Sequence, residues 1–371
     1  MLTVNFSRLL TQPFIAGLVV LLSGCQESQD DAATTAQSDP AQLSDTLRIL
    51  ASDEFYGRAP GGPGEALTVN YLIERFTELG LEPAGERGGW TQSVPLIHTQ
   101  ISAPTDNTPT LRIDADGATV NLIQGTDVEF STTRPVTQAV IVNAPIVFVG
   151  HGAFAPERNW DDFSDIDLRG KLAIFLVNDP DFAAREDEAV AGRFGGKRMT
   201  YYGRWTYKFE EAARRGALAA LVVHDDAGAG YGWNVASSSP GENYSIERPA
   251  DGIEPPLLQG WIHNDAASEL FTLAGLSLEE QRRLARADAF QAFELKGITV
   301  STTLEVEMEV VQSQNVLARL KGSSRPEETI MVSGHWDAYG IGEPDSLGRT
   351  VRPGANDDAL GIAGVIELAR V

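Results

Sequence analysis

One histidine and three aspartates near the C-terminal end of the 371-residue sequence have types and a spacing that could support catalysis. His335 and Asp337 follow a short apolar run at residues 330–332, which predicts a buried strand. Ligand sites in open α/β sheets form beyond the carboxyl ends of strands, and an i, i+2 spacing in extended backbone turns both side chains the same way. Asp357 and Asp358 directly precede a small and apolar segment that predicts a helix. We therefore expect two carboxylates at a helix N-terminus.

These residue types suit zinc. A neutral imidazole and a carboxylate are zinc ligands, a carboxylate can bridge two ions, and a metal-binding histidine usually gives its other N–H to a carboxylate. His335, Asp357 and Asp337 fill these three roles in that order. The alternative is structural: Asp357 or Asp358 would cap the helix, and His335 would pack at the edge of the sheet.

The two motifs resemble the first half of the metal site of the family-28 zinc metallopeptidases. Residues 334–337 read GHWD and residues 353–370 read PGANDDALGIAGVIELAR. The family contains dizinc exopeptidases, among them bacterial leucyl aminopeptidases and, with an inserted protease-associated domain, glutamate carboxypeptidase II. The resemblance implies that His335 binds one zinc ion, that Asp357 bridges both ions, and that Asp337 orients His335. It also implies that the Asp357–Asp358 peptide bond is cis.

The same resemblance implies parts that this sequence lacks. In the family, a Glu-Glu pair provides the general base and a ligand, and a further acidic ligand and a second ligand histidine follow. All of them lie C-terminal to the helix in which Val371 lies. We therefore expect the chain to be the N-terminal portion of a longer enzyme, with an incomplete metal shell and no activity of its own.

A second segment supports the resemblance. Residues 54–61 fit the pattern E-x-x-G-R-x-P-G, which in enzymes of this type precedes a helix and the inserted domain. The segment is glycine-rich but does not predict a phosphate-binding loop, because Pro60 and Pro63 lack backbone donors and no Lys-Ser/Thr pair follows. Helices are expected at residues 43–50 and 66–79 from the spacing of their apolar residues.

The middle of the chain alternates between strands and helices. Short alternating segments within residues 91–134 predict β-hairpins, and apolar strands are expected at 140–142, 146–149, 172–177 and 218–223. Helices are expected at 207–215 and 278–289, and later strands at 298–311 and 315–320. Residues 147–180 resemble a protease-associated domain. The fold class is therefore α/β: an incomplete mixed sheet of the dizinc exopeptidase type with helices on both faces, plus an inserted α/β protease-associated domain.

The remaining chemistry-bearing residues are weaker candidates. The other histidines are scattered without ligand spacing, so surface or packing positions are expected for His98, His151, His224 and His263. The aromatic cluster at residues 201–207 fits either a substrate wall or packing between domains, and the sequence does not decide between them.

The N-terminus has the pattern of a bacterial lipoprotein signal peptide. Residues 1–25 hold one basic side chain, Arg8, and an apolar stretch too short to span a bilayer. The stretch ends in LSGC, which resembles a lipobox, and Cys25 is the only cysteine of the chain. Lipidation of Cys25 is therefore expected, with a free thiol in the signal segment as the alternative. Disulfides within the chain are excluded.

Composition limits the partners and suggests domains. A formal net charge of −23 argues against nucleic acid and anionic membrane surfaces as partners. We expect a flexible linker at residues 26–40, an N-terminal part of the peptidase domain at 41–134, a protease-associated domain at 135–297, and the first part of the metallopeptidase domain at 298–371.

Together these features predict a zinc-dependent exopeptidase, an aminopeptidase acting on peptides with two zinc ions, lipid-anchored in the bacterial cell envelope. One alternative is a non-catalytic binding protein of the same architecture, against which the presence of His335, Asp337 and Asp357 argues. The other is a glutaminyl-cyclase-like acyl transfer. The sequence does not distinguish an aminopeptidase from a carboxypeptidase, nor does it indicate the oligomeric state.

Overall fold

The computed structural model describes residues 37–104, 108–115, 117–248, 252–342, 344–345 and 347–371. The predicted signal peptide, Cys25 and most of the predicted linker lie outside these residues. The chain divides into two units, Met1–Ser38 and Asp39–Val371, and the second unit is described below. No helix within the described ranges is long and apolar enough to cross a lipid bilayer.

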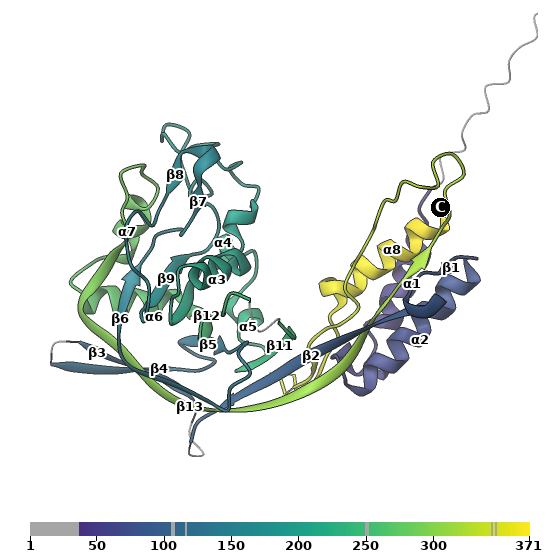
Figure 1. The fold of residues 1–371 in the computed structure, drawn as a ribbon, viewed down its shortest axis with the longest axis horizontal. Coiled ribbons are helices and arrows are strands. Elements are labelled where there is room, and N and C mark those ends of the chain that lie inside the picture. Colours follow the sequence, from purple (N-terminus) through teal and green to yellow (C-terminus); the bar gives the residue numbers. More distant parts are fainter. Residues whose placement is uncertain (1–36, 105–107, 116, 249–251, 343, 346) are drawn as a thin grey trace, which may run out of the picture. The chain divides into compact units, whose positions relative to one another are not determined.

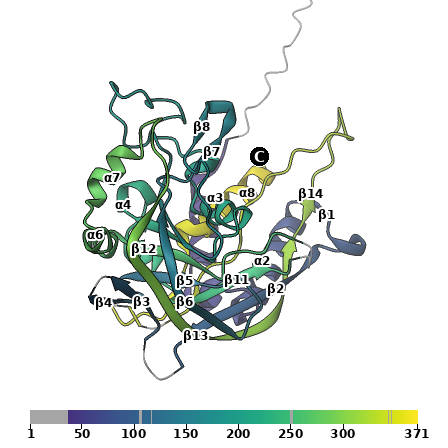
Figure 2. The same cartoon turned by 60° about the vertical axis from the view of Figure 1, so that its left-hand side comes forward.

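A ten-stranded mixed sheet is the largest element of the fold (Figures 1 and 2). Its strand order is β11-β2-β13-β6-β9-β10-β12-β5, and the β3–β4 hairpin pairs with β13. Strands β6, β9, β10 and β12 run parallel to one another, and the other pairs are antiparallel. The strands are β2 (Thr91–Ser102), β3 (Thr110–Ala115), β4 (Ala118–Ile123), β5 (Val128–Ser131), β6 (Gln138–Phe148), β9 (Leu172–Leu176), β10 (Ala219–His224), β11 (Glu242–Ile246), β12 (Leu258–His263) and β13 (Phe293–Val316).

Helices cover both faces of the parallel strands. Alternate residues of β9 enter two separate clusters: Ile174 packs with Phe271 of α6 (Asn264–Leu273), and Phe175 packs with Phe209 of α3 (Trp205–Arg214). All of β9 is buried, as expected for a parallel strand between two helical layers. This confirms the predicted α/β class with a mixed sheet and helices on both faces.

Most of the predicted strands and helices are present, with some mergers. Of the hairpins predicted within residues 91–134, β3–β4 is present, whereas β2 and β5 pair with strands distant in the sequence, so the prediction was wrong for them. Strand β6 joins the two strands expected at 140–142 and 146–149. Helix α3 ends at Arg214, and Gly216 follows in a left-handed conformation (φ 71°). Helix α7 (Leu278–Leu284) is shorter than the predicted 278–289, because i to i+3 turns replace it before β13 begins.

Strand β13 is one strand of 24 residues, and it includes the strand predicted at 298–311. The strand predicted at 315–320 is divided between the end of β13 and β14 (Ala318–Arg319), which pairs with β1 (Glu82–Pro83). The large sheet contains strands from each of the segments 41–134, 135–297 and 298–371. The sheet therefore does not mark a boundary between the predicted domains, and the domain boundaries stay a prediction.

Three helices form a smaller core that holds the predicted site. These are α1 (Pro40–Leu50), α2 (Pro63–Glu78) and α8 (Leu360–Arg370), close to the helices predicted at 43–50, 66–79 and after Asp358 (Figure 1). Buried residues of these helices and of the turn before α8 form one cluster with Trp336, consisting of Leu50, Leu72, Phe76, Ala359, Ile362 and Ile366. The loop that carries His335 is thereby anchored to the helices.

The strand predicted at residues 330–332 is absent. Residues 329–339 form neither helix nor strand, and Ile330 and Met331 are 92% and 81% exposed. A strand needs a neighbour to satisfy its backbone groups. No strand among the described residues pairs with this run, so its apolar composition alone does not produce a strand. His335 and Asp337 consequently lie in a loop.

The remaining elements are short. They are β7 (Phe154–Ala155), β8 (Trp160–Asp161), β15 (Gly340–Ile341), β16 (Val351–Arg352), α4 (Asp226–Ala229), α5 (Trp233–Ala236), the 3₁₀ turns Asp53–Arg58, Glu86–Gly88, Pro156–Arg158 and Tyr201–Gly203, and the π-type turn Ala355–Ala359.

Candidate metal centre

The loop at residues 333–339 has one buried side chain, and the two residues beside it in the sequence are accessible. Trp336 is buried in the small helical core, and its Nε1 donates to the carbonyl of Gln314 at 3.0 Å. The neighbouring side chains of His335 and Asp337 are about half exposed, at 52% and 46%. The tryptophan thus fixes the loop while its two neighbours remain accessible to a ligand.

The second loop brings its two aspartates to the N-terminus of α8 in different roles. Asp358 Oδ1 accepts the backbone N–H of Gly361 at 2.9 Å, and its Oδ2 accepts the N–H of His335 at 3.2 Å. Asp358 therefore caps the helix and joins the two loops. The Asp357 side chain is 61% exposed and makes no such cap. The Asp357–Asp358 peptide bond is cis, as predicted.

His335 lies between two carboxylates. Its Nε2 is 2.9 Å from Asp357 Oδ1, and its Nδ1 is 3.3 Å from Asp337 Oδ1 and 3.2 Å from the Asp337 carbonyl oxygen. Partial burial alone would lower the pKa of His335, but the charges of Asp337 and Asp357 outweigh it and raise that pKa. The structure thus brings together all three residues predicted from the sequence, with the two nitrogens of the ring facing different carboxylates.

The donor types at this point fit zinc. The imidazole Nε2 and a carboxylate oxygen meet at one accessible position, and the other ring nitrogen has an acidic partner of the kind that orients metal-binding histidines. Within the part of the chain that the structure describes, no group of three or more His, Cys, Asp or Glu side chains could hold a metal ion. His335 and Asp357 are therefore two candidate ligands, and their role as ligands stays a prediction.

Two tyrosines beside Asp357 were not predicted. Burial is the main cause of the raised pKa of Tyr339, and the charge and hydrogen bond of Asp357 add to it. Burial also raises the pKa of Tyr231 to about 12, with contributions from Tyr339 and Asp357. Tyr339 is four residues from His335 and could have been noticed, whereas nothing in the sequence near Tyr231 connects it with the motifs.

The aromatic cluster at residues 201–207 packs partly within itself and partly lines a hollow, and packing between domains stays a prediction. Tyr202 and Tyr207 pack against each other at 5.2 Å between ring centroids, and Tyr207 is buried. Trp205 instead lines a hollow of about 170 Å³ together with Tyr231 and Trp261. The cluster therefore combines internal packing with an open aromatic wall, and a substrate role for the wall stays a prediction.

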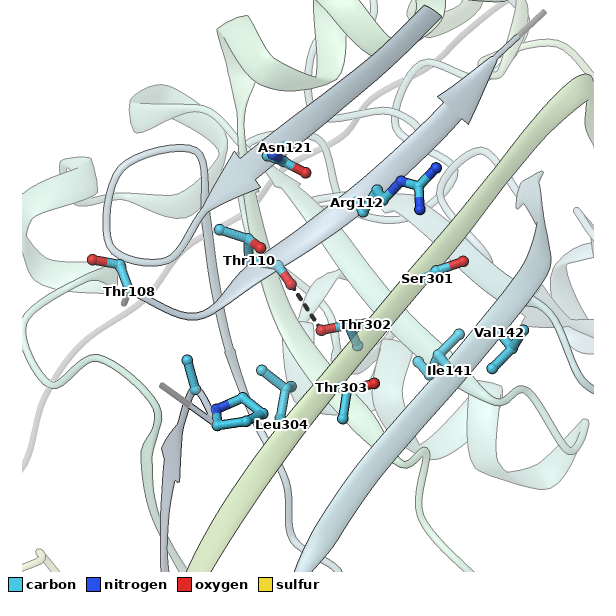
Figure 3. Close-up of a pocket in the computed structure, with 12 residues that line it drawn as sticks. Thr108, Thr110, Arg112, Asn121, Ile141, Val142, Ser301, Thr302, Thr303 and Leu304 are labelled. Atoms are coloured by element: carbon cyan, nitrogen blue, oxygen red, sulfur yellow. Dashed lines mark hydrogen bonds between the residues drawn. The ribbon is translucent and has the colours of Figure 1, made fainter. Parts of the chain in front are cut away.

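A larger hollow lies on the sheet and lacks catalytic groups (Figure 3). It has a volume of about 430 Å³ and is formed by residues of β3, β4, β6 and β13 and the segments beside them. Its polar lining consists of hydroxyl and amide side chains and Arg112, and Thr302 Oγ1 donates to the carbonyl of Thr110 at 2.8 Å. No histidine, cysteine or carboxylate lines this hollow among the described residues, so it is not the candidate centre.

The other four histidines have packing or surface roles, as predicted. His98 lies 3.1 Å from both Glu242 and Glu309 and stacks on Tyr244. The buried ring of His151 contacts the carbonyl of Asn178 at 3.1 Å. His224 is buried beside Trp233 and Trp261, and His263 Nδ1 accepts the N–H of Asp265 at the start of α6.

Comparison with known proteins connects the site with peptidases. The model of Peptidase family M28 matches residues 315–371, which include His335, Asp337 and Asp357. A probable zinc metalloprotease of Pyricularia oryzae is 44% identical over 62 residues, covering 16% of this chain and 12% of that protein. A probable glutamate carboxypeptidase of Arabidopsis thaliana is 23% identical over 312 residues, covering 75% of this chain and 38% of that protein.

Solved structures give more distant matches. An aminopeptidase from Aneurinibacillus sp. strain AM-1 is 20% identical with a TM-score of 0.39, covering 90% of this chain and 58% of that chain. A zinc aminopeptidase from Bacillus subtilis is 15% identical with a TM-score of 0.35, covering 89% of this chain and 57% of that chain. The chain spans less than two-fifths of the length of the curated relatives named above.

Proposed function

We propose that the protein, at the full length of its relatives, is a zinc-dependent exopeptidase that hydrolyses the N-terminal residues of peptides. The observation that carries this proposal is the meeting of His335 Nε2 and Asp357 Oδ1 at 2.9 Å, with Asp337 behind the ring. These residues lie in the segment that matches Peptidase family M28. The similarity to a probable zinc metalloprotease supports zinc as the metal. The removal of N-terminal residues is a more specific part of the proposal than peptidase activity in general.

Each residue of the site has a distinct part in the proposal. His335 and Asp357 would hold zinc, with Asp357 shared between two ions. Asp337 would accept the Nδ1–H of His335 and so keep Nε2 free to bind the metal. Asp358 would keep the two loops together through its bonds to His335 and Gly361. When bound, zinc would lower the pKa of a water molecule and polarise the scissile carbonyl.

The proposal is tested by following release of the amine from a panel of aminoacyl-anilides by the full-length protein. Activity that a chelator removes and zinc restores would support it. A parallel panel of peptides blocked at the N-terminus and free at the C-terminus separates an aminopeptidase from a carboxypeptidase. A zinc-loaded protein that hydrolyses neither panel would contradict an exopeptidase function.

A protease-associated domain at residues 135–297 and a lipid anchor at Cys25 complete the proposal. The inserted domain would shape the cleft that receives the peptide, and the anchor would hold the enzyme on the bacterial cell envelope. The support for the anchor is the lipobox-like LSGC and the absence of any other cysteine from the sequence.

Replacing Cys25 by serine is expected to move the protein from the membrane fraction to the soluble fraction. The physical reason is that stable anchoring needs more than one acyl chain, and a lipidated cysteine carries several. Fractionation of cells with metabolic labelling by a fatty acid measures both outcomes. A C25S protein that stays acylated in the membrane fraction would show that Cys25 is not the attachment site.

A further inference from the structure

Arg58 is an unusual residue because its whole side chain is buried beside the candidate centre. It is 0% exposed, and its backbone adopts a left-handed conformation (φ 53°). A buried guanidinium is costly unless its donors are satisfied. Here the acceptors are backbone carbonyls, so the conformation and burial of Arg58 are held in place by the chain around it.

The carbonyls that Arg58 contacts belong to three segments. Its Nε donates at 2.7 Å to the carbonyl of Trp336, the residue between His335 and Asp337 in the sequence. Its Nη1 donates to Pro353 at 2.7 Å and also to Leu50, the last residue of α1. Its Nη2 donates to Gly354 at 2.9 Å, the residue before the turn that carries Asp357. One guanidinium therefore joins both loops of the centre to a helix.

The surrounding backbone is packed closely enough to make this arrangement specific. The N–H of Ala338 donates back to the carbonyl of Arg58 at 3.2 Å. A Cβ on Gly57 would lie 2.3 Å from the carbonyl oxygen of Gly340, and a Cβ on Gly354 would lie 3.0 Å from Arg58 Nη2. Both glycines have positive φ angles, 66° and 54°. The crossing of these segments thus depends on glycine at two positions and on arginine between them.

We propose that Arg58 is a positioning residue for the metal centre, which sets the separation of His335 and Asp357 by holding the carbonyls of Trp336, Pro353 and Gly354. The inference rests on the proposed zinc site, but it concerns the geometry of the two loops. A lysine cannot replace the arginine here, because one ammonium group presents its donors from a single atom and not from a planar fork.

The positive charge of Arg58 should weaken zinc binding, whereas its positioning of the loops should strengthen it. Substitutions can therefore separate the effect of charge from the effect of geometry. Arg58 interacts with the nearby carboxylates of Asp337 and Asp358. A positive charge next to a metal site repels the metal ion. If charge were its main effect, Arg58→Met would strengthen zinc binding and Arg58→Lys would leave it unchanged. If geometry is its main effect, both substitutions weaken zinc binding.

The test measures zinc affinity of the full-length protein by competition with a chromophoric chelator. We expect Arg58→Lys to weaken zinc binding by roughly 10–100-fold, the range typical for partners that orient metal ligands. The matched control is Arg193→Lys, because Arg193 also donates to two backbone carbonyls, those of Arg158 and Asn159, at 2.8 Å. The control is expected to keep the wild-type affinity.

A second readout needs no metal. Hydrogen exchange in the 371-residue chain should become faster at the amide of His335 in Arg58→Lys, because this amide donates to Asp358 across the two joined loops. The amide of Gly361, which donates to the same carboxylate from the first turn of α8, should follow it. In Arg193→Lys these amides should exchange as in the wild type. A folded Arg58→Lys protein with unchanged zinc affinity and unchanged exchange would overturn the inference.

If Arg58→Lys does not fold, Arg58→Met provides the same test, because it removes every side-chain donor to the carbonyls of Trp336, Pro353 and Gly354. Unchanged or stronger zinc binding by a folded Arg58→Met protein would also overturn the inference. A different result would contradict the proposed function. If the wild-type protein binds zinc in a way that depends on Arg58 but hydrolyses no peptide, the exopeptidase function is wrong and the positioning role of Arg58 still holds.

Discussion

Asp357→Ala is expected to remove both the peptidase activity and most of the bound zinc of the full-length protein. Asp357 Oδ1 meets the imidazole of His335 at 2.9 Å and is shared between two ions in the proposal. Loss of a direct ligand should therefore exceed the roughly 10–100-fold effect of losing a residue that only orients a ligand. Initial rates on an aminoacyl-anilide and zinc content by elemental analysis measure the two effects.

A comparison with two other aspartates makes this expectation specific. Asp45→Ala is the matched control, since its side chain is 67% exposed against 61% for Asp357, and it should keep full activity. Asp358→Ala should instead lower the thermal stability, because it removes the cap of α8, typically worth about 1 kcal/mol. Full activity and zinc content in Asp357→Ala would show that the metal site is wrongly placed.

The sequence predicted the parts of the fold that depend on local pattern. The continuous apolar run of β9 and the short alternating segments of the β3–β4 hairpin are properties of a few neighbouring residues, so they can be recognised without the rest of the chain. The run at residues 330–332 shows the limit of this approach. Its composition suits a strand, but a strand also needs a pairing partner, and the run itself does not contain that information.

The candidate site was predictable for the same reason, and only in part. His335, Asp337 and Asp357 carry recognisable side-chain chemistry at a short separation in the sequence. The contacts of Arg58 could not be predicted, because its acceptors are backbone carbonyls, which are the same in every residue. Tyr231 lies more than a hundred residues from Asp357 in the sequence, and only the folded chain brings their charges into interaction.

The 371-residue chain by itself is expected to bind zinc weakly and to hydrolyse no aminoacyl substrate. A catalytic zinc site usually has about three protein ligands, whereas the described residues bring two candidates together, His335 and Asp357. Both candidates are more than half exposed, so water competes for any ion that they hold. We expect well under one zinc ion per chain after dialysis, measured together with anilide release in the presence and absence of a chelator.

The same chain is also expected to self-associate. Large apolar side chains are exposed in the segment before His335 and on α8, with Ile330 at 92%, Met331 at 81% and Leu368 at 55%. Exposed apolar groups that lie close together favour association, which light scattering at rising protein concentration would detect. Replacing Ile330 and Met331 by serine should reduce the scattering without changing zinc content, since neither side chain belongs to the proposed centre. Chelator-sensitive turnover by the 371-residue chain would show that it contains a complete metal site, and the arrangement proposed around His335 and Asp357 would then be wrong.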